Sequence, residues 1–117
     1  MNVKINFKNE NIIDALIGAL EGGSNYWYFL PDVSMVKKID NKSLSECIVL
    51  SALSGIEIPV YDVEAEDIFL GNISKQNIRR GIKLYIKSGR SFDVENMDAI
   101  DMDILFQYVV MGDIVFG

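Results

Sequence analysis

Hydrophobic and polar residues alternate along two segments of the chain, as expected for strands that bury one face. The first segment comprises residues 3–7, and the second comprises residues 56–63, where Pro59 favours an edge strand or a bulge. Three further short segments also fit an extended conformation: residues 26–30, 35–39 and 114–116. The first of these is equally compatible with an irregular segment, because it ends at a proline.

Apolar residues recur at helical spacing in four other segments, and each of these segments ends at a glycine that can adopt the left-handed conformation. Ser43 and Glu46 have the spacing of a capping box, and Ser74 can cap the third helix. We expect helices at residues 10–21, 44–54, 74–87 and 97–111. In the last helix, the expected inward positions are Ile100, Ile104, Leu105, Tyr108 and Met111.

These elements do not follow the regular strand–helix–strand order of a parallel sheet. A chain of 117 residues suffices for one hydrophobic core but not for two. We therefore predict a single α+β domain over residues 1–117, with about four helices packed on a small, mainly antiparallel sheet.

The composition narrows the classes of function. The chain has no histidine and one cysteine, Cys47, so it lacks the most frequent general base and cannot build a tetrahedral zinc site. We therefore expect no cofactor and no zinc site, and we favour a protein that is not an enzyme, while carboxylates that bind a hard cation remain an alternative. We find no signal peptide and no run of about 18 apolar residues, so we expect a cytoplasmic protein without a membrane contact.

Charge is segregated along the chain, whose net charge is -6. Residues 75–90 carry six bases and no acid, whereas residues 91–117 carry six acids and no base. Four bases recur at every fourth position and would form one stripe on a helix: Lys75, Arg79, Lys83 and Lys87. The simplest interpretation is the solvated face of an amphipathic helix, neutralised by the acidic segment. An acidic protein partner and a nucleic-acid phosphate backbone are the alternatives, and the sequence pI of about 4.5 disfavours nucleic acid.

A second group of acids follows the strand at residues 56–63, and it consists of Asp62, Glu64, Glu66 and Asp67. The simplest interpretation is an exposed acidic turn. If the segment is extended, Asp62, Glu64 and Glu66 share one face and could hold Mg²⁺ or Ca²⁺. Alternatively, both acidic groups could mimic the phosphates of a nucleic acid.

Four consecutive aromatic residues, Tyr26, Trp27, Tyr28 and Phe29, follow the glycine pair that ends the first predicted helix. Successive side chains of a strand alternate between its faces, so we expect two of the four to be partly exposed. Exposed tyrosine and tryptophan are typical of protein interfaces, and we predict that this segment binds a protein partner or a second copy of the chain. The alternative is that these rings form core between the sheet and a helix.

One loose pattern suggests an enzyme. Pro31-Asp32 followed by Asp40-Asn41-Lys42 resembles the arrangement in Mg²⁺-dependent nucleases, where two acids hold the metal and a lysine orients the attacking water. The spacing is short, so a metal-dependent nuclease is the least favoured interpretation.

Motifs near the start and at the end of the chain resemble those of a known family, and the likeness spans most of the chain. Ala19 to Trp27, with the sequence ALEGGSNYW, together with DAID at 98–101, FQY at 106–108 and GDIVFG at 112–117, resembles a family of small bacteriophage and prophage proteins. The resemblance implies a phage-type accessory protein in the bacterial cytoplasm, which binds a host or phage protein and for example blocks a host-defence factor. It assigns no catalytic role to any residue.

Overall fold

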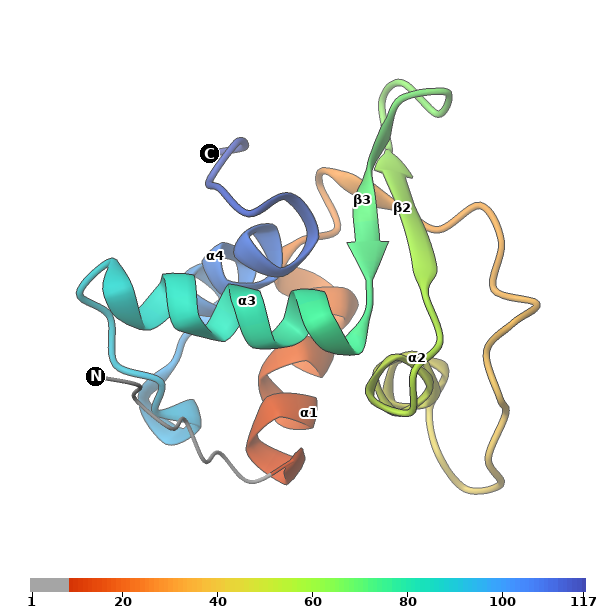
Figure 1. The fold of residues 1–117 in the computed structure, drawn as a ribbon, viewed down its shortest axis with the longest axis horizontal. Helices are drawn as coiled ribbons and strands as arrows, with labels where there is room; N and C mark the ends of the chain where they lie inside the picture. Colours follow the sequence, from red (N-terminus) through yellow and green to blue (C-terminus); the bar gives the residue numbers. More distant parts are fainter. Residues whose placement is uncertain (1–8) are drawn as a thin grey trace.

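The computed structural model describes residues 9–117, in which four helices pack on a small three-stranded antiparallel sheet (Figure 1). This is the α+β fold predicted from the sequence. The helices are α1 (Asn9–Gly18), α2 (Leu44–Leu53), α3 (Lys75–Lys87) and α4 (Ala99–Met111), and the strands are β1 (Tyr28–Phe29), β2 (Ile58–Asp62) and β3 (Phe69–Ile73). The strand predicted at residues 3–7 lies outside the described residues.

Local capping explains why three of the helices begin where the sequence predicts. The hydroxyl oxygens of Ser43 and Ser74 accept hydrogen bonds from the backbone N–H groups three residues later, at the start of α2 and α3. Asp98 and Asp101 form a reciprocal capping box at the start of α4. Gly112 ends α4 in the left-handed conformation, with φ of 73°. The end of the first helix differs from the prediction, because a π-helical turn over Ala19–Gly23 continues α1 through the glycine pair.

The sheet has the strand order β1-β2-β3, and its inner face is apolar. Ile58 pairs with Ile73, and Val60 pairs with Gly71, so these residues point to the same side, where the helices cover them. The sequence did not predict β3. A Cβ atom at Gly71 would lie 2.0 Å from the carbonyl oxygen of Val110, so glycine lets the end of α4 cross this strand.

Two predicted strands are irregular segments in the structure, because side chains satisfy their backbone groups. In residues 35–39, the N–H of Lys37 donates to Ser51 Oγ at 3.0 Å and the N–H of Ile39 contacts the sulfur of Cys47. In residues 114–116, the backbone likewise bonds to a side chain of α4 rather than to a strand.

The inward face of α4 also differs from the prediction. Ile100 is 69 % exposed, whereas two polar residues, Asp103 and Gln107, are buried next to Phe106 and Val110. This helix is apolar on nearly every side, so hydrophobicity alone does not identify the buried face.

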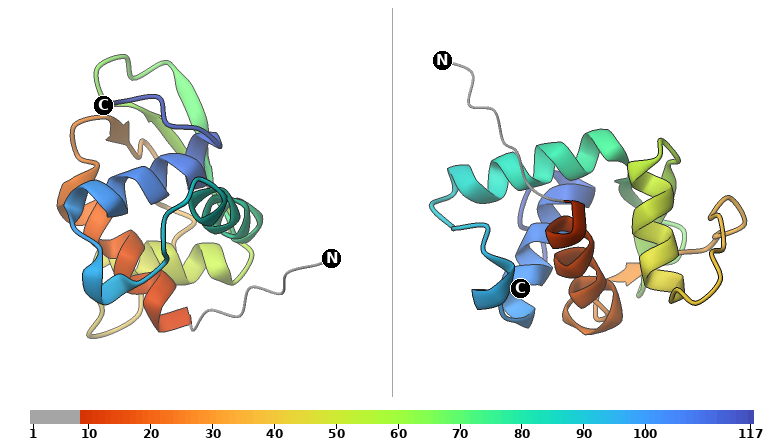
Figure 2. Two further views of the ribbon diagram at one scale, coloured as in Figure 1. Left: turned by 90° about the vertical axis from the view of Figure 1, so that its left-hand side faces the viewer. Right: turned by 90° about the horizontal axis from the view of Figure 1, so that it is seen from below.

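Helix α3 lies on the outside of the helical layer and packs against α4 (Figures 1 and 2). The contact is close at Gly81, where a Cβ atom would lie 2.7 Å from the Cα atom of Val109. The buried side of α3 carries Ile78, Ile82 and Tyr85, so its basic residues face outward. No helix among residues 9–117 is long and apolar enough to cross a membrane.

Candidate functional site

The predicted aromatic segment is divided between the core and the surface. Trp27 is 1 % exposed and packs its ring 5.3 Å from that of Phe106. Tyr28 is half-buried, and its hydroxyl donates to the carbonyl of Leu20. Tyr26, in contrast, is 50 % exposed. Trp27 is therefore a core residue, and a partner cannot contact its side chain in the folded chain.

A buried carboxylate collects the polar groups of this segment. Asp103 is 7 % exposed and accepts hydrogen bonds from Ser24 Oγ at 2.7 Å, Trp27 Nε1 at 2.7 Å and the Tyr26 hydroxyl at 2.5 Å. Gln107, one helical turn later, adds a fourth donor at 3.2 Å. We call these residues the Asp103 network. Among residues 9–117, every buried side-chain nitrogen or oxygen has a hydrogen-bond partner, so the network is fully satisfied.

Gln107 extends the network to the end of the chain. Its Oε1 accepts from the N–H groups of Val115 and Phe116, both at 2.9 Å, and its Nε2 donates to the carbonyl of Phe116 at 3.0 Å. The ring of Phe116 then stacks on that of Trp27, with centroids 5.4 Å apart and planes at 15°. The motif at residues 19–27 and the motif at residues 112–117 therefore meet in space.

The hydrogen bonds of the Asp103 network have a structural role, because they hold residues 24–27 against α4. Ser24 is fully buried, and the hydroxyls of Ser24 and Tyr26 are both held as donors to the carboxylate. Desolvation, followed by the hydrogen bond to Asp103, raises the pKa of Tyr26 to about 12. Half of the Tyr26 side chain is exposed, but its hydroxyl is turned into the network.

From the sequence, Asp103 counts only as one of the six acids of residues 91–117, and Gln107 has no assigned role. A signal was present, because Asp103 and Gln107 are the only polar side chains other than Tyr108 in the apolar run 102–111, and they are four residues apart. In a helix that is apolar on all sides, two such residues must share a buried face.

The outer face of the sheet carries a row of three aromatic side chains. Phe29 pairs with Tyr61 across β1 and β2, and Tyr61 pairs with Phe69 across β2 and β3. Paired residues point to the same face, and the rings of Tyr61 and Phe69 lie 5.5 Å apart, edge to face. Phe69 is 52 % exposed. We call these three residues the aromatic row, and Phe29 is the member that the predicted segment contributes.

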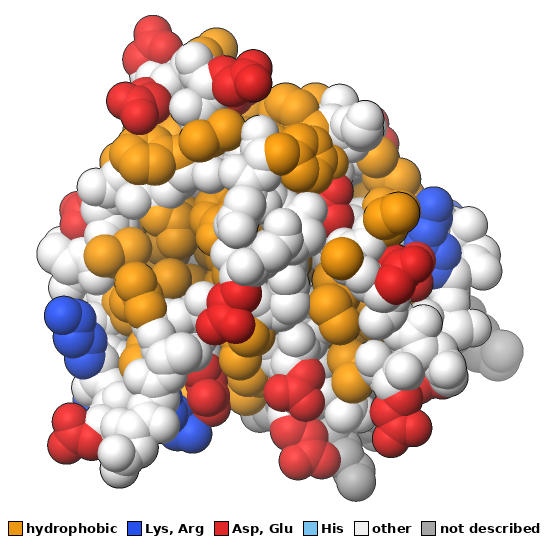
Figure 3. All heavy atoms as spheres, turned by 180° about the vertical axis from the view of Figure 1, so that it is seen from behind, with side chains coloured by type: hydrophobic (Ala, Val, Ile, Leu, Met, Phe, Trp, Pro, Cys, Tyr) orange, Lys and Arg blue, Asp and Glu red, His pale blue; other side chains and the backbone are white. Residues whose placement is uncertain are grey.

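The aromatic row lies next to the turn between β2 and β3, which we call the acidic turn (residues 62–67). Figure 3 shows this turn as an acidic projection above a band of hydrophobic side chains. Glu64, Glu66 and Asp67 are exposed, and Asp62 accepts a hydrogen bond from the N–H of Glu64 at 2.8 Å. The segment is a turn rather than the extended strand on which Asp62, Glu64 and Glu66 would share one face.

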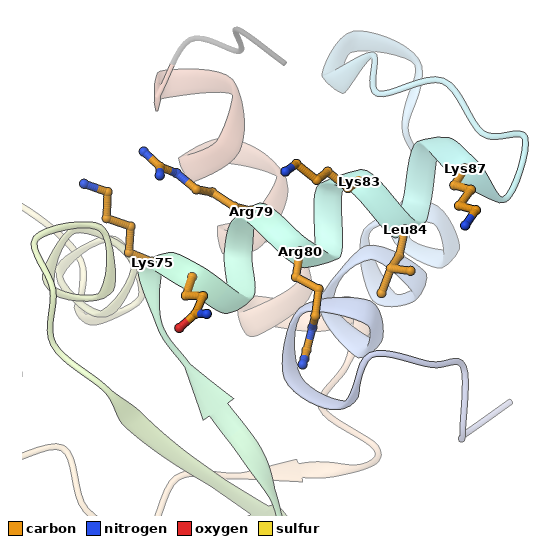
Figure 4. A pocket seen from close by; sticks show the side chains of 7 residues that line it. Lys75, Arg79, Arg80, Lys83, Leu84 and Lys87 are labelled. Atoms are coloured by element: carbon orange, nitrogen blue, oxygen red, sulfur yellow. The ribbon is translucent and has the colours of Figure 1, made fainter. Parts of the chain in front are cut away.

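The predicted basic stripe is present on α3, and Figure 4 shows its side chains along the exposed side of the helix. A shallow groove on this side is lined by five bases together with Gln76 and Leu84: Lys75, Arg79, Arg80, Lys83 and Lys87. Arg80 donates to the carbonyl oxygen of Val109 at 2.9 Å, near the end of α4. In residues 9–117 the one ion pair is that between Lys42 and Glu46, so no acidic side chain there forms an ion pair with the stripe.

The nuclease-like pattern is not assembled. The Lys42 ammonium bonds to Glu46 at 2.9 Å, and this hydrogen bond raises the pKa of Lys42. Asp32 is exposed and accepts from Ser34 instead, which lowers the pKa of its carboxyl. Across the described part of the chain, no three acidic or cysteine side chains converge as metal ligands would.

No protein-family model, no curated protein and no solved structure matches this chain. The candidate sites therefore rest on the residues themselves.

Proposed function

We propose that this protein is a non-enzymatic binding protein, which docks on a partly apolar, basic surface of a protein partner through the aromatic row and the acidic turn. The resemblance of its ends to phage and prophage proteins supplies the context. In that context it is a phage-type accessory protein in the bacterial cytoplasm, and its partner is a host or phage protein, for example a host-defence factor that it blocks.

The aromatic row is the observation that carries this proposal. Single exposed hydrophobic residues are ordinary, but here three aromatic residues pair across three strands, and the rings of Tyr61 and Phe69 are in edge-to-face contact. Aromatic residues are enriched at the centres of protein interfaces, where they bury a large area at a low cost in side-chain entropy. A row of this kind on the solvent side of a sheet is therefore suited to docking.

The acidic turn favours a basic partner. Its three exposed acids stand at one end of the row, where they would form the charged rim of an interface. Such a rim accelerates association with a positively charged surface and repels a nucleic acid, whose phosphates would approach the same edge. The rings are thus better suited to a protein than to base stacking.

Affinity capture from the bacterial host tests the proposal when it is combined with single substitutions. Phe69→Ala and Tyr61→Ala remove rings from the row, and each is expected to weaken a captured partner about tenfold, the usual cost of losing an interface anchor. Ile100→Ala is the matched control, because it removes an exposed hydrophobic side chain from α4, away from the sheet.

The affinities of the two ring variants and of the control are measured by titration with the purified partner. Loss of affinity in both ring variants, with Ile100→Ala unchanged, supports the docking surface. A partner that binds all folded variants equally well would refute it, as would a partner whose contact surface is acidic.

A further inference from the structure

A second charged surface lies on α3, away from the aromatic row. Residues 75–90 hold six of the eleven lysines and arginines of the chain and no acid. None of these bases forms an ion pair within residues 9–117, and residues 1–8 contain no acidic side chain that could supply one. Among the described residues, no ion pair therefore neutralises their charge.

The geometry of this surface fits a linear array of negative charges. Lys75, Arg79, Lys83 and Lys87 are spaced by four residues, which places successive bases about 6 Å apart along the helix axis. This spacing is similar to that of consecutive phosphates on a nucleic-acid strand. We call these four residues the basic face.

Arg80 lies beside the basic face and lines the same groove. Its guanidinium is held by the carbonyl of Val109, so it is already ordered and adds a fixed positive charge to the groove. The four bases of the basic face are exposed, and Figure 4 shows their side chains extending from α3.

The lining of the groove favours a phosphate backbone over a protein. Five of its seven residues are lysine or arginine, and Leu84 is its single apolar member. Protein interfaces contain an apolar core that is depleted in lysine, whereas nucleic-acid interfaces are polar and strongly basic.

The net charge of -6 does not oppose this contact, because many of the acidic side chains lie on the side of the molecule opposite to α3. Helix α3 lies at the front of Figure 1, and the charged side chains on the face seen from behind in Figure 3 are mainly acidic. The molecule measures 26 Å along the axis that separates these views. At physiological ionic strength, charges are screened over about 8 Å, so a ligand on α3 is shielded from the acids behind it.

We propose that the basic face of α3 is a binding site for the sugar–phosphate backbone of a nucleic acid, independent of the docking surface on the sheet. Neutralisation of four phosphates predicts a slope of log affinity against log salt of about -3.6 for duplex DNA and about -2.8 for a single strand. For the duplex, affinity would then fall about a hundredfold between about 50 and 200 mM salt.

Fluorescence anisotropy with a short labelled DNA, as a duplex and as a single strand, tests this site. The double variant Arg79→Ala/Lys83→Ala removes two of the four contacts, so the duplex slope should fall by about 1.8. Lys37→Ala/Lys38→Ala is the matched control, because it removes the same charge from an exposed segment that is not part of α3.

Retention of the full slope in the control, together with the reduced slope of the α3 variant, supports the site. Three results would overturn it: no binding at about 50 mM salt, equal losses in both variants, or displacement of the DNA by polyglutamate at the same charge concentration. The last result would assign α3 to an acidic protein instead. All three leave the aromatic row untouched, since they involve no residue of the sheet.

Discussion

Asp103 lies in an environment that is unusual for an acidic residue, because its side chain is buried. Its carboxylate has no cationic partner in the described structure, and four side-chain N–H and O–H groups solvate it in place of water. Hydrogen-bonded burial of this kind is stable only while every donor and acceptor is paired.

Substitution of Asp103 should therefore be severe. Asp103→Ala leaves the Ser24 hydroxyl and the Trp27 N–H buried without an acceptor, and we expect a loss of about 3 to 5 kcal/mol in the free energy of unfolding. Urea denaturation measures this loss. Asp113→Ala removes the same charge from an exposed position and should stay within about 0.5 kcal/mol of the unsubstituted protein. Similar small effects of both would show that the network does not stabilise the fold.

Tyr26 makes the stability of the network depend on alkaline pH. Its pKa is raised from 10.0 to about 12 in the folded chain, so the folded state keeps the proton over a range in which the unfolded chain releases it. The hydrogen bond from Tyr26 to Asp103 thus contributes fully below pH 10, and this contribution is lost as the pH rises toward 12.

The variant Tyr26→Phe isolates this contribution. It should be less stable than the unsubstituted protein by about 1 kcal/mol at neutral pH, and the difference should shrink between pH 10 and about 12. The other tyrosines titrate in both proteins, so their effects cancel in the difference. A difference that is constant across this range would contradict the assignment.

At the scale of elements, the contact between α3 and α4 depends on one glycine. A Cβ atom at Gly81 would meet the backbone of Val109 at 2.7 Å, and backbone atoms cannot yield as a flexible side chain can. Gly81→Ala should therefore force the helices apart and cost about 1 to 3 kcal/mol, despite the better helix propensity of alanine.

Gly22 provides the matched control within the π-helical turn. It is exposed, and a Cβ atom there would meet nothing within 4 Å, so Gly22→Ala should be neutral or should stabilise by up to about 1 kcal/mol. Thermal unfolding of the two variants gives the comparison. Equal effects would mean that α3 and α4 are not in close contact at Gly81.

The elements that the sequence predicted are those with local signals. Capping residues and terminal glycines act within a few positions, and for this reason α2, α3 and α4 begin and end within about two residues of the prediction. Strand β3 was missed because FLGNI does not alternate and contains a glycine. That glycine is explained by the carbonyl of Val110, a contact between segments far apart in the chain.

The same distinction applies to the candidate sites. The basic face was predictable because its spacing lies within one helix. The aromatic row was not, since it joins Phe29 to two strands whose pairing the sequence did not reveal. The burial of Trp27 depends on Asp103, which lies 76 residues away.

At the scale of the whole molecule, the Asp103 network joins segments that lie far apart in the sequence. Residues 24–27, the middle of α4 and the segment 115–116 all meet at Trp27 and Gln107. Because this junction joins distant parts of one core, it should open only when the domain unfolds, in one cooperative transition.

Phe116→Ala tests that cooperativity, because it removes the ring on Trp27 and keeps the backbone bonds to Gln107. Phe116 is only partly buried, so we expect a loss of about 2 kcal/mol, less than for a phenylalanine in the core. Val115→Ala, at a residue that is 59 % exposed, should change stability by less than about 0.5 kcal/mol.

Trp27 is the sole tryptophan, so its fluorescence reports the junction while circular dichroism reports the helices. Both signals should shift together in Phe116→Ala. A fluorescence change that precedes the loss of helix would instead show that the terminal segment opens as a separate unit, and would limit the network to a local role.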